Sequence, residues 1–242
     1  MRRQRADRLL VERGLFQSRA KAQAAIAAGL VSADGALVGR AADEVAVDAV
    51  LRAEAAHPWV SRGGLKLAAA LDRFGFDPKG RVCLDVGAST GGFTQVLLAR
   101  GARRVYAVDV GRDQLDPGLR ARAEVVSLEQ TDIRSLGPGR LPEAADLVTV
   151  DVSFISLKLV LEPALSLAQR PAQAVALIKP QFEAGRRHLK KGIVRDPQVH
   201  AQVCEEIRAS TEALGWQVLD IVPSPIEGGD GNREFLLGAA AA

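Results

Sequence analysis

Residues 85–94 have the sequence Asp-Val-Gly-Ala-Ser-Thr-Gly-Gly-Phe-Thr. The apolar run 82–84 precedes this stretch, and the apolar sequence Val-Leu-Leu-Ala follows it at 96–99. This order predicts a strand, a glycine-rich turn and a helix. Glycine lets backbone amides approach a ligand without interference from a Cβ atom, and the first N–H groups of a helix have no partners within it. The stretch therefore predicts a ligand-binding turn around which the fold is built.

From residue 63 onward, the chain alternates between helix and strand patterns. Helices are expected at 65–74, 92–100, 155–169 and 197–214. Strands are expected at 82–86, 104–110, 124–128, 146–152, 174–179, 217–222 and 233–237. The alternation predicts an α/β fold with a Rossmann-like, doubly wound sheet of seven strands, and such sheets bind ligands at the carboxyl ends of their strands. We expect 238–242 to be a frayed end.

The first 52 residues predict a separate small unit. Two short helices are expected within 3–30, the second capped by Ser18 and ended by Gly29. A hairpin with an Asp-Gly turn is expected at 30–38, and one more strand near 44–53. Because the periodicity is lost before Pro58, we expect a first domain over 1–57, a linker over 58–63 and a second domain over 64–242.

Composition excludes several classes of protein. A hydrophobic content of 48% and a charged content of 25% are ordinary for a soluble protein. No apolar run reaches the roughly 18 residues of a membrane helix, and no apolar segment follows the basic N-terminus as in a secretion signal. We therefore expect a cytoplasmic protein without membrane contact. Cys83 and Cys204 lack histidine or cysteine neighbours at ligand spacing, which favours reduced thiols and no metal site.

Positive charge is unevenly distributed. Residues 1–30 carry seven basic and two acidic side chains, a local charge of +5 in a chain of net charge +3. A second basic run, Arg-Arg-His-Leu-Lys-Lys, occupies 186–191. Solvated surface is one explanation, but clustered positive charge in a nearly balanced protein suggests a nucleic-acid partner.

The glycine turn does not match the common nucleotide-binding patterns. Ser89 occupies the position of the second glycine of a dinucleotide-binding fingerprint, and no Gly-Lys-Ser/Thr follows as in a phosphate-binding loop. Taken alone, the turn is equally well explained as a tight strand–helix connection. The spacing Asp-x-Gly-x-x-x-Gly resembles the first motif of S-adenosylmethionine-dependent methyltransferases.

That resemblance implies a set of cofactor contacts. The acid that ends the second strand, here Asp109, would bind the ribose hydroxyls, and the acid after the third strand, Asp132, would reach the adenine amino group. The expected cofactor-binding residues are Asp85, Gly87, Ala88, Ser89, Gly91, Gly92, Phe93, Asp109, Asp132 and Asp151.

Four ionisable residues occupy positions that a doubly wound sheet brings together. Asp151 and Lys179 each end an apolar strand, Glu234 begins the last strand, and Lys66 lies on the helix before the first core strand. An exposed helix lysine is the simpler explanation for Lys66 alone. The order Lys-Asp-Lys-Glu resembles the catalytic tetrad of FtsJ-type RNA 2′-O-methyltransferases.

The chemistry explains this set of residues. A ribose 2′-hydroxyl is a weak nucleophile that must lose its proton as it attacks a sulfonium methyl group. A lysine oriented by carboxylates can assist that proton transfer. By resemblance, Lys179 would activate the hydroxyl. Asp151 and Lys66 would orient Lys179 and tune its charge, and Glu234 would complete the network. Alignment of the reacting atoms would supply most of the rate.

The first unit resembles the αL RNA-binding domain of a small-subunit ribosomal protein, tyrosyl-tRNA synthetases and pseudouridine synthases. The pattern is Ser18-Arg-Ala-Lys-Ala, then Gly29-Leu-Val and the Asp-Gly turn. Phosphate contacts of the kind implied supply affinity rather than sequence readout. We also interpret the basic loop 182–198 as an RNA-contacting lid, with a mobile surface loop as the alternative. The expected RNA-binding residues are Arg5, Arg8, Arg19, Lys21, Arg62, Arg186, Arg187, Lys190 and Lys191.

Further motifs extend the resemblance to nearly the whole chain. They are Asp-Val-Ser-Phe-Ile-Ser-Leu at 151–157, Ile-Lys-Pro-Gln-Phe-Glu at 178–183 and Gly-Asn-Arg-Glu-Phe at 231–235. With the first unit and the glycine turn they resemble the TlyA family, historically named haemolysin A. The resemblance implies 2′-O-methylation of cytidines in ribosomal RNA, S-adenosylmethionine as cofactor, and ribosomal RNA or ribosomal subunits as partners of a monomer. His57-Pro58 departs from the Arg-Ala that members often carry before the tryptophan.

Two other functions remain possible from the sequence. A non-catalytic RNA-binding or ribosome-associated factor would retain the scaffold without the chemistry, and the intact tetrad disfavours it. A pore-forming haemolysin would need a membrane span, an amphipathic hairpin repeat or a secretion signal, none of which the sequence shows, so we rank it last.

Overall fold

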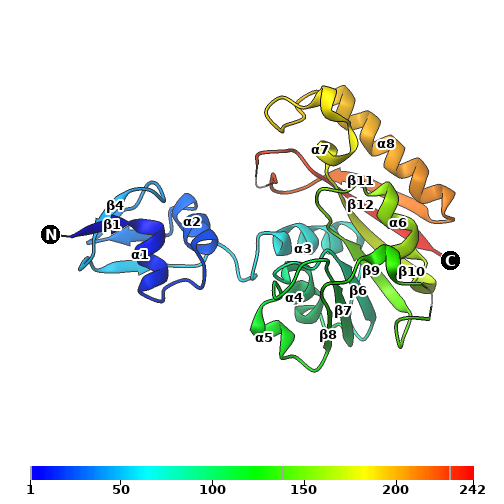
Figure 1. Ribbon diagram of the computed structural model, residues 1–242, viewed down its shortest axis with the longest axis horizontal. Helices are drawn as coiled ribbons and strands as arrows, with labels where there is room; N and C mark the ends of the chain where they lie inside the picture. Colours follow the sequence, from blue (N-terminus) through cyan, green and yellow to red (C-terminus); the bar gives the residue numbers. More distant parts are fainter. Residues whose placement is uncertain (1, 138, 229) are drawn as a thin grey trace. The chain divides into compact units, whose positions relative to one another are not determined.

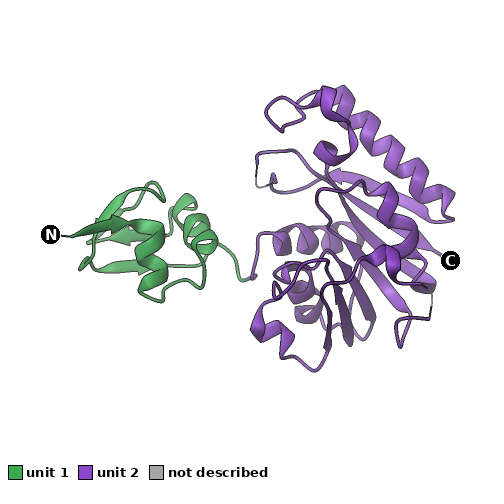
Figure 2. Cartoon of the chain, viewed as in Figure 1, with its two compact units in different colours: residues 1–58 green, residues 59–242 purple. Residues whose placement is uncertain are grey.

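The computed structural model describes residues 2–137, 139–228 and 230–242. Contacts divide the chain into two compact units, Met1–Pro58 and Trp59–Ala242 (Figure 2). Each unit has its own hydrophobic core.

The first unit packs two helices against short strands. The helices are α1 (Ala6–Glu12) and α2 (Arg19–Ala27), and the Ser18 hydroxyl caps α2 by accepting the Lys21 N–H at 3.3 Å. The strands are β1 (Arg3–Arg5), which pairs with β4 (Glu44–Ala46), and β2 (Val31–Ala33), which pairs with both β3 (Ala36–Leu37) and β5 (Leu51–Ala53). The expected helices and hairpin are confirmed. The single strand expected near 44–53 is wrong, because a turn at 47–48 divides it between two sheets.

The second unit is built on one seven-stranded sheet (Figure 1). Its spatial order is β11-β12-β10-β9-β6-β7-β8, and β12 runs antiparallel to both of its neighbours. The strands are β6 (Val82–Val86), β7 (Arg104–Val108), β8 (Val125–Leu128), β9 (Ala145–Val150), β10 (Ala168–Ile178), β11 (Gln217–Pro223) and β12 (Phe235–Ala241). This arrangement confirms the predicted Rossmann-like, doubly wound α/β fold.

Helices cover both faces of this sheet (Figure 1). The helices are α3 (Gly63–Phe74), α4 (Gly92–Ala99), α5 (Pro117–Arg120), α6 (Lys158–Leu165), α7 (Pro180–Glu183) and α8 (Pro197–Ala213), with 3₁₀ turns η1 (Ile133–Ser135) and η2 (Arg186–His188). Cys83 packs with the core on the α3 and α4 side, whereas its neighbour Leu84 packs with the core that contains residues of α6 and α8. The central strand β6 is thus buried on both faces, as parallel sheets require. Trp216 also lies in the core.

Several expected element boundaries are wrong. The end of the chain is not frayed, because β12 runs to Ala241 and Ala239 is fully buried. Small residues are needed there, since a Cβ on Gly238 would lie 2.5 Å from the Phe74 ring. Helix α6 begins at Lys158 rather than 155, and β10 begins at Ala168 rather than 174.

Candidate active site

Strand register brings the glycine turn and Asp151 together. In the parallel pair β6–β9, Val86 lies opposite Val150, so Gly87 and Asp151 leave the sheet side by side. Gly87 has φ +82°, and a Cβ there would overlap the carbonyl oxygen of Asp151. Only glycine fits both the backbone conformation and the close approach.

The other glycines of the turn are required by packing. A Cβ on Gly91, which has φ +94°, would overlap the Leu119 side chain, and a Cβ on Gly92 would overlap the Ser61 hydroxyl. The segment before α3 therefore lies directly against the start of α4. The turn is rigid because neighbours contact it on both sides.

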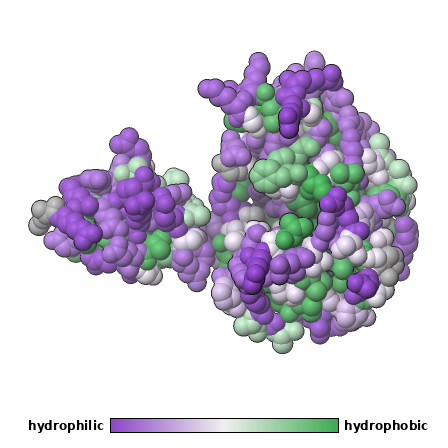
Figure 3. Space-filling model, viewed as in Figure 1, coloured by the Kyte–Doolittle hydropathy of each residue, from purple (hydrophilic) through white to green (hydrophobic). Residues whose placement is uncertain are grey.

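A cavity of about 500 Å³ opens at the carboxyl ends of β6, β7 and β9. This volume is in the range of small-molecule and cofactor sites. Five of the predicted cofactor-binding residues line it: Gly87, Ser89, Asp109, Asp132 and Asp151. The other five, Asp85, Ala88, Gly91, Gly92 and Phe93, do not line it. Figure 3 shows hydrophobic residues gathered across the visible face of the second unit and surrounded by hydrophilic ones.

Two backbone N–H groups hold the Asp109 carboxylate in place by hydrogen bonds. Its Oδ2 accepts the Ser89 N–H at 2.8 Å, and its Oδ1 accepts the Gly111 N–H at 2.7 Å. Ser89 holds φ +48°, which aims its amide at this carboxylate. Asp109 is therefore preorganised at the rim of the cavity.

Asp85 lies beneath the turn rather than in the cavity. It is fully buried and accepts hydrogen bonds from the Thr94 hydroxyl at 2.7 Å and the Thr149 hydroxyl at 3.2 Å. Burial raises the pKa of this carboxyl to about 7, although both hydroxyls oppose the rise. Asp85 thus braces β6 against β9 and α4.

Asp132 is held by a neighbouring cation. The Arg134 guanidinium donates to both carboxylate oxygens at 2.6–3.0 Å and holds the pKa of Asp132 below its usual value. Both side chains line the cavity. A ligand amino group at this carboxylate would share its oxygens with Arg134.

The four tetrad residues form two ion pairs. Lys179 Nζ lies 2.6 Å from Asp151 Oδ1, and Lys66 pairs with Glu234. The antiparallel ladder β10–β12 places Ile178 opposite Phe235, so Lys179 and Glu234 occupy adjacent positions just beyond it. Lys66 and Glu234 are both buried. The simpler explanation of Lys66 as an exposed helix lysine is therefore wrong.

Two residues near Lys179 were missed by the sequence reasoning. Ser153 Oγ accepts a hydrogen bond from Lys179 Nζ at 2.8 Å. Phe154 is 92% exposed, has φ +63°, and lies with its ring centroid 5.2 Å from that of Phe182. A bulky residue at positive φ is strained. Because the Phe154 ring is exposed, burial of the ring does not offset this strain. The sequence signal was a phenylalanine three residues after both Asp151 and Lys179.

Glu183 fixes these loops to each other. Its Oε2 accepts the Ser156 hydroxyl and its Oε1 accepts the Leu157 N–H, both at 2.6 Å. The carboxylate thereby joins α7, which follows Lys179, to the start of α6, which follows Asp151. This contact holds the two strand-end motifs in register.

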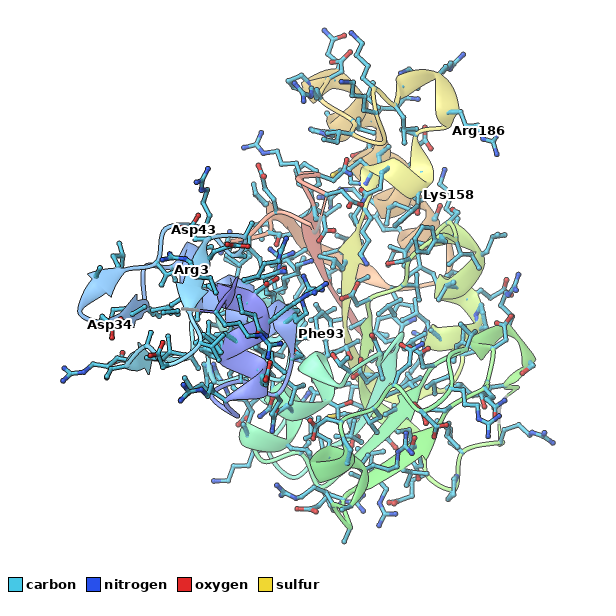
Figure 4. The ribbon with its side chains drawn as sticks, turned by 60° about the vertical axis from the view of Figure 1, so that its left-hand side comes forward. Arg3, Asp34, Asp43, Phe93, Lys158 and Arg186 are labelled. Carbon is cyan, nitrogen blue, oxygen red and sulfur yellow. The ribbon has the colours of Figure 1, made fainter. Side chains whose placement is uncertain are left out.

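The predicted RNA-binding residues differ in how free their charges are. Arg186, Arg187, Lys190 and Lys191 are exposed on a segment that contains η2 and a bridge between Lys190 and Ile193. Arg186 projects outward in Figure 4. Arg62 is also exposed.

In the first unit, the four predicted contacts divide into two groups. Arg8 is exposed, and Lys21 donates to Gln17 at 2.8 Å. Arg5 and Arg19 instead form ion pairs with the buried Asp7, at 3.1 and 2.7 Å. Among the residues described, no helix is long and apolar enough to cross a membrane.

Comparison with known proteins yields matches over the whole chain. The model of the FtsJ-like methyltransferase family matches residues 59–241. The 16S/23S rRNA (cytidine-2′-O)-methyltransferase TlyA of Mycobacterium tuberculosis is 45% identical over 241 residues, which cover 98% of this chain and 89% of that protein. Hemolysin A of Brachyspira hyodysenteriae is 36% identical, with 96% and 98% covered.

A solved structure gives the same result. A protein of Streptococcus thermophilus, provisionally named a hemolysin, superposes with a TM-score of 0.79 at 39% identity and covers 100% of this chain and 90% of its own. The similarity thus extends through both units.

Proposed function

Since this chain belongs to the FtsJ-like methyltransferase family, we propose that it transfers the methyl group of S-adenosylmethionine to the ribose 2′-hydroxyl of a cytidine in ribosomal RNA. The observation that carries the proposal is the pair Lys179–Asp151 at the rim of the 500 Å³ cavity. The name of the Mycobacterium tuberculosis relative supports cytidine as the target.

The cavity suits the cofactor. The Asp109 carboxylate, already oriented by Ser89, can accept hydrogen bonds from two adjacent ribose hydroxyls. Gly87 leaves room for a ligand to approach the backbone. When bound, S-adenosylmethionine supplies an electrophilic methyl group. Asp151 lines the same cavity, so the lysine that pairs with it stands next to the cofactor.

Lys179 is proposed to activate the hydroxyl. An ammonium group has three donors, and two of them face Asp151 and Ser153. In the neutral form, the amine accepts the hydroxyl proton as the oxygen attacks, and Asp151 stabilises the resulting ammonium. Alignment of oxygen, methyl and sulfur then supplies most of the rate. No covalent enzyme intermediate is required.

Lys66 and Glu234 are proposed to keep the site dry and aligned. Their pair is buried, and Glu234 precedes β12 beside Lys179. Buried charges hold each other in place because separation would leave one of them unpaired. The two residues therefore act as positioning groups for Lys179.

Each part of the chain has a proposed role. Residues 1–57 would form an RNA-binding domain, 58–63 a linker and 64–242 the methyltransferase domain. The exposed Arg8 and Arg62, the half-buried Lys21 and the basic segment 186–191 would contact the RNA backbone. The protein would act as a cytoplasmic monomer on ribosomal RNA or ribosomal subunits.

The direct test is transfer of a tritiated methyl group from S-adenosylmethionine to purified ribosomal subunits. Lys179→Ala should reduce transfer by about a hundredfold or more, the scale of a lost acid–base group. Lys158→Ala is the matched control, because Lys158 (Figure 4) is a surface lysine of the same unit that pairs with Glu206.

Two outcomes would contradict the proposal. Binding of RNA without methyl transfer would favour a non-catalytic ribosome-associated factor. Transfer that survives Lys179→Ala would remove Lys179 from the activating role while leaving the reaction intact.

A further inference from the structure

A second cavity, of about 210 Å³, lies apart from the cofactor cavity. One side of its wall consists of Ile193, Val194, Arg195 and His200, and the other consists of Glu227, Gly231 and Arg233. Arg195, Arg233 and Glu227 supply its charged groups. The volume is below the usual range for cofactors and metabolites, so it suits one small polar group.

Hydrogen bonds and a ring contact connect the walls of this cavity. Asn232 is 1% exposed, accepts the Val194 N–H at 3.1 Å and donates to the Gly192 carbonyl at 3.0 Å. His200 Nε2 lies 3.0 Å from the Val194 carbonyl, and its ring packs edge-on against Phe235. These contacts join the basic segment to the loop before β12. Asn232 and His200 therefore tie the described parts of the two walls to each other.

The two arginines of the cavity lack partners among the described residues. Within 2–137, 139–228 and 230–242, neither Arg195 nor Arg233 makes an ion pair or a hydrogen bond. Elsewhere in the second unit, arginines are commonly paired with carboxylates, as Arg103 is with Glu143 at 2.7 Å. Two guanidinium groups and one carboxylate, Glu227, leave the cavity with net positive charge, which favours an anion. Planar guanidinium groups match phosphate geometry especially well.

The position of Arg233 connects this cavity with the candidate active site. Arg233 immediately precedes Glu234, which pairs with Lys66. Asn232 and Glu234 are buried while Arg233 is exposed, so the chain presents alternate side chains to the interior and to the cavity side. An anion bound by Arg233 would therefore lie against the backbone that carries Glu234.

We propose that Arg195 and Arg233 form a subsite for a phosphodiester group of the RNA strand, close to the target nucleotide. This subsite rests on the proposed function, because it names a contact of the same substrate. Glu227, in the same cavity, opposes anion binding and keeps free phosphate from occupying the subsite tightly. Arg195 lies within the expected RNA-contacting loop 182–198, and Arg233 extends the expected RNA surface beyond that loop.

Inorganic phosphate is the first probe. The chain has three histidines, so the ring signals of His200 can be assigned by nuclear magnetic resonance with the help of His200→Gln. Phosphate should shift the His200 signals in the full-length protein and fail to shift them in Arg195→Ala with Arg233→Ala. Unshifted His200 signals at saturating phosphate in Glu227→Gln, where the opposing charge is gone, would overturn the proposal.

RNA affinity is the second readout, measured with a fluorescent fragment of ribosomal RNA. Each of Arg195→Ala and Arg233→Ala should weaken binding about three- to tenfold and lower the salt slope by about one, as for a lost phosphate contact. Glu227→Gln should tighten binding, and Arg103→Ala should leave it unchanged. Arg195→Gln repeats the test if the alanine variant folds poorly. Wild-type affinity in both arginine variants would overturn the subsite.

Methyl transfer separates this proposal from the function on which it rests. The arginine variants should raise KM for RNA and leave kcat close to that of the unmodified protein. Transfer with an unchanged KM would remove the subsite and leave the function standing. Weakened RNA binding in a protein that transfers no methyl group would do the reverse.

Discussion

The carboxylate of Asp7 is fully buried and lies 2.7 Å from the Arg19 guanidinium. Arg5 and Gln23 donate to the same carboxylate, at 3.1 and 2.8 Å. Two of the four cations that the sequence predicted for RNA binding in the first unit are therefore tied to an internal acid. Both arginines remain partly accessible. Of the four predicted cations, Arg8 and Lys21 form no ion pair with a carboxylate of the described residues.

Asp7→Asn should destabilise the first unit, because two guanidinium groups would lose their shared anion. The arginines are half exposed, so solvent limits the loss, and we expect the midpoint of thermal unfolding of this unit to fall by about 5–10 °C. Hydrogen exchange of α1 and α2 in the full chain measures the effect. Arg40→Ala is the control, since Arg40 pairs with Asp43 at the surface.

The same carboxylate predicts a pH dependence. Its side-chain hydrogen bonds, led by that from Arg5, hold the pKa of Asp7 well below the ordinary 3.8. A carboxyl with a lowered pKa stabilises the fold above the ordinary value, and that stability is lost as the pH falls through the folded-state pKa. Protection of α1 and α2 should therefore decline below about pH 4. The decline should be smaller in Asp7→Asn, and an equal decline in both proteins would rule out this cause.

The raised pKa of Asp85 predicts the opposite dependence of folding stability on pH. Its pKa is raised from 3.8 to about 7, so its ionisation costs folding free energy as the pH rises above 3.8, and the cost is fully present above about pH 7. Asp85→Asn keeps the shape and cannot ionise. It should unfold with a free energy higher by on the order of 3 kcal/mol at pH 8, with the difference shrinking toward pH 5. Denaturant titrations of the two proteins at both pH values measure it. A constant difference would contradict the assignment.

Gly87→Ala should abolish cofactor binding. The added Cβ would overlap the Asp151 carbonyl and would force alanine to φ +82°, so the turn and Asp151 must move apart. Gly80→Ala is the matched control, because Gly80 also has a positive φ, +71°, but open space around its Cβ position. Calorimetric titration with S-adenosylhomocysteine should detect binding in the control at close to the unmodified affinity and none in Gly87→Ala.

Only part of the candidate site could be predicted from the sequence. The chain pattern places Gly87, Asp109 and Asp151 at one edge of the sheet, because parallel strands bring their carboxyl ends together. Their roles toward a cofactor came from the resemblance to methyltransferases. The burial of Lys66 and Asp85 could not be found, since it depends on how α3 and α4 pack on the sheet. The Arg5 and Arg19 pairs were missed for a similar reason: charge counting does not show that Asp7 is buried between them.

Phe154→Ala should lower methyl transfer without destabilising the fold. Phe154 is 92% exposed and has φ +63°. Removal of its ring therefore costs little packing energy. An exposed ring at the rim of the cavity is suited to stack on a base of the RNA, a contact of about 1–3 kcal/mol. We expect transfer at low RNA concentration to fall about tenfold. Phe154→Trp should retain it, and an equal loss in both variants would argue against stacking.

Lys66 and Glu234 allow stability and catalysis to be separated. Lys66→Met leaves Glu234 buried without its partner, which should cost about 3–5 kcal/mol of folding free energy. Adding Glu234→Gln removes the orphaned charge, so Lys66→Met with Glu234→Gln should regain most of that stability, because buried pairs can be replaced by neutral groups at little cost. If the pair positions Lys179, the double variant should be stable and still impaired in methyl transfer, with RNA affinity unchanged. A double variant that regains activity along with stability would assign the pair to folding alone, and would leave the chemistry to Lys179 and Asp151.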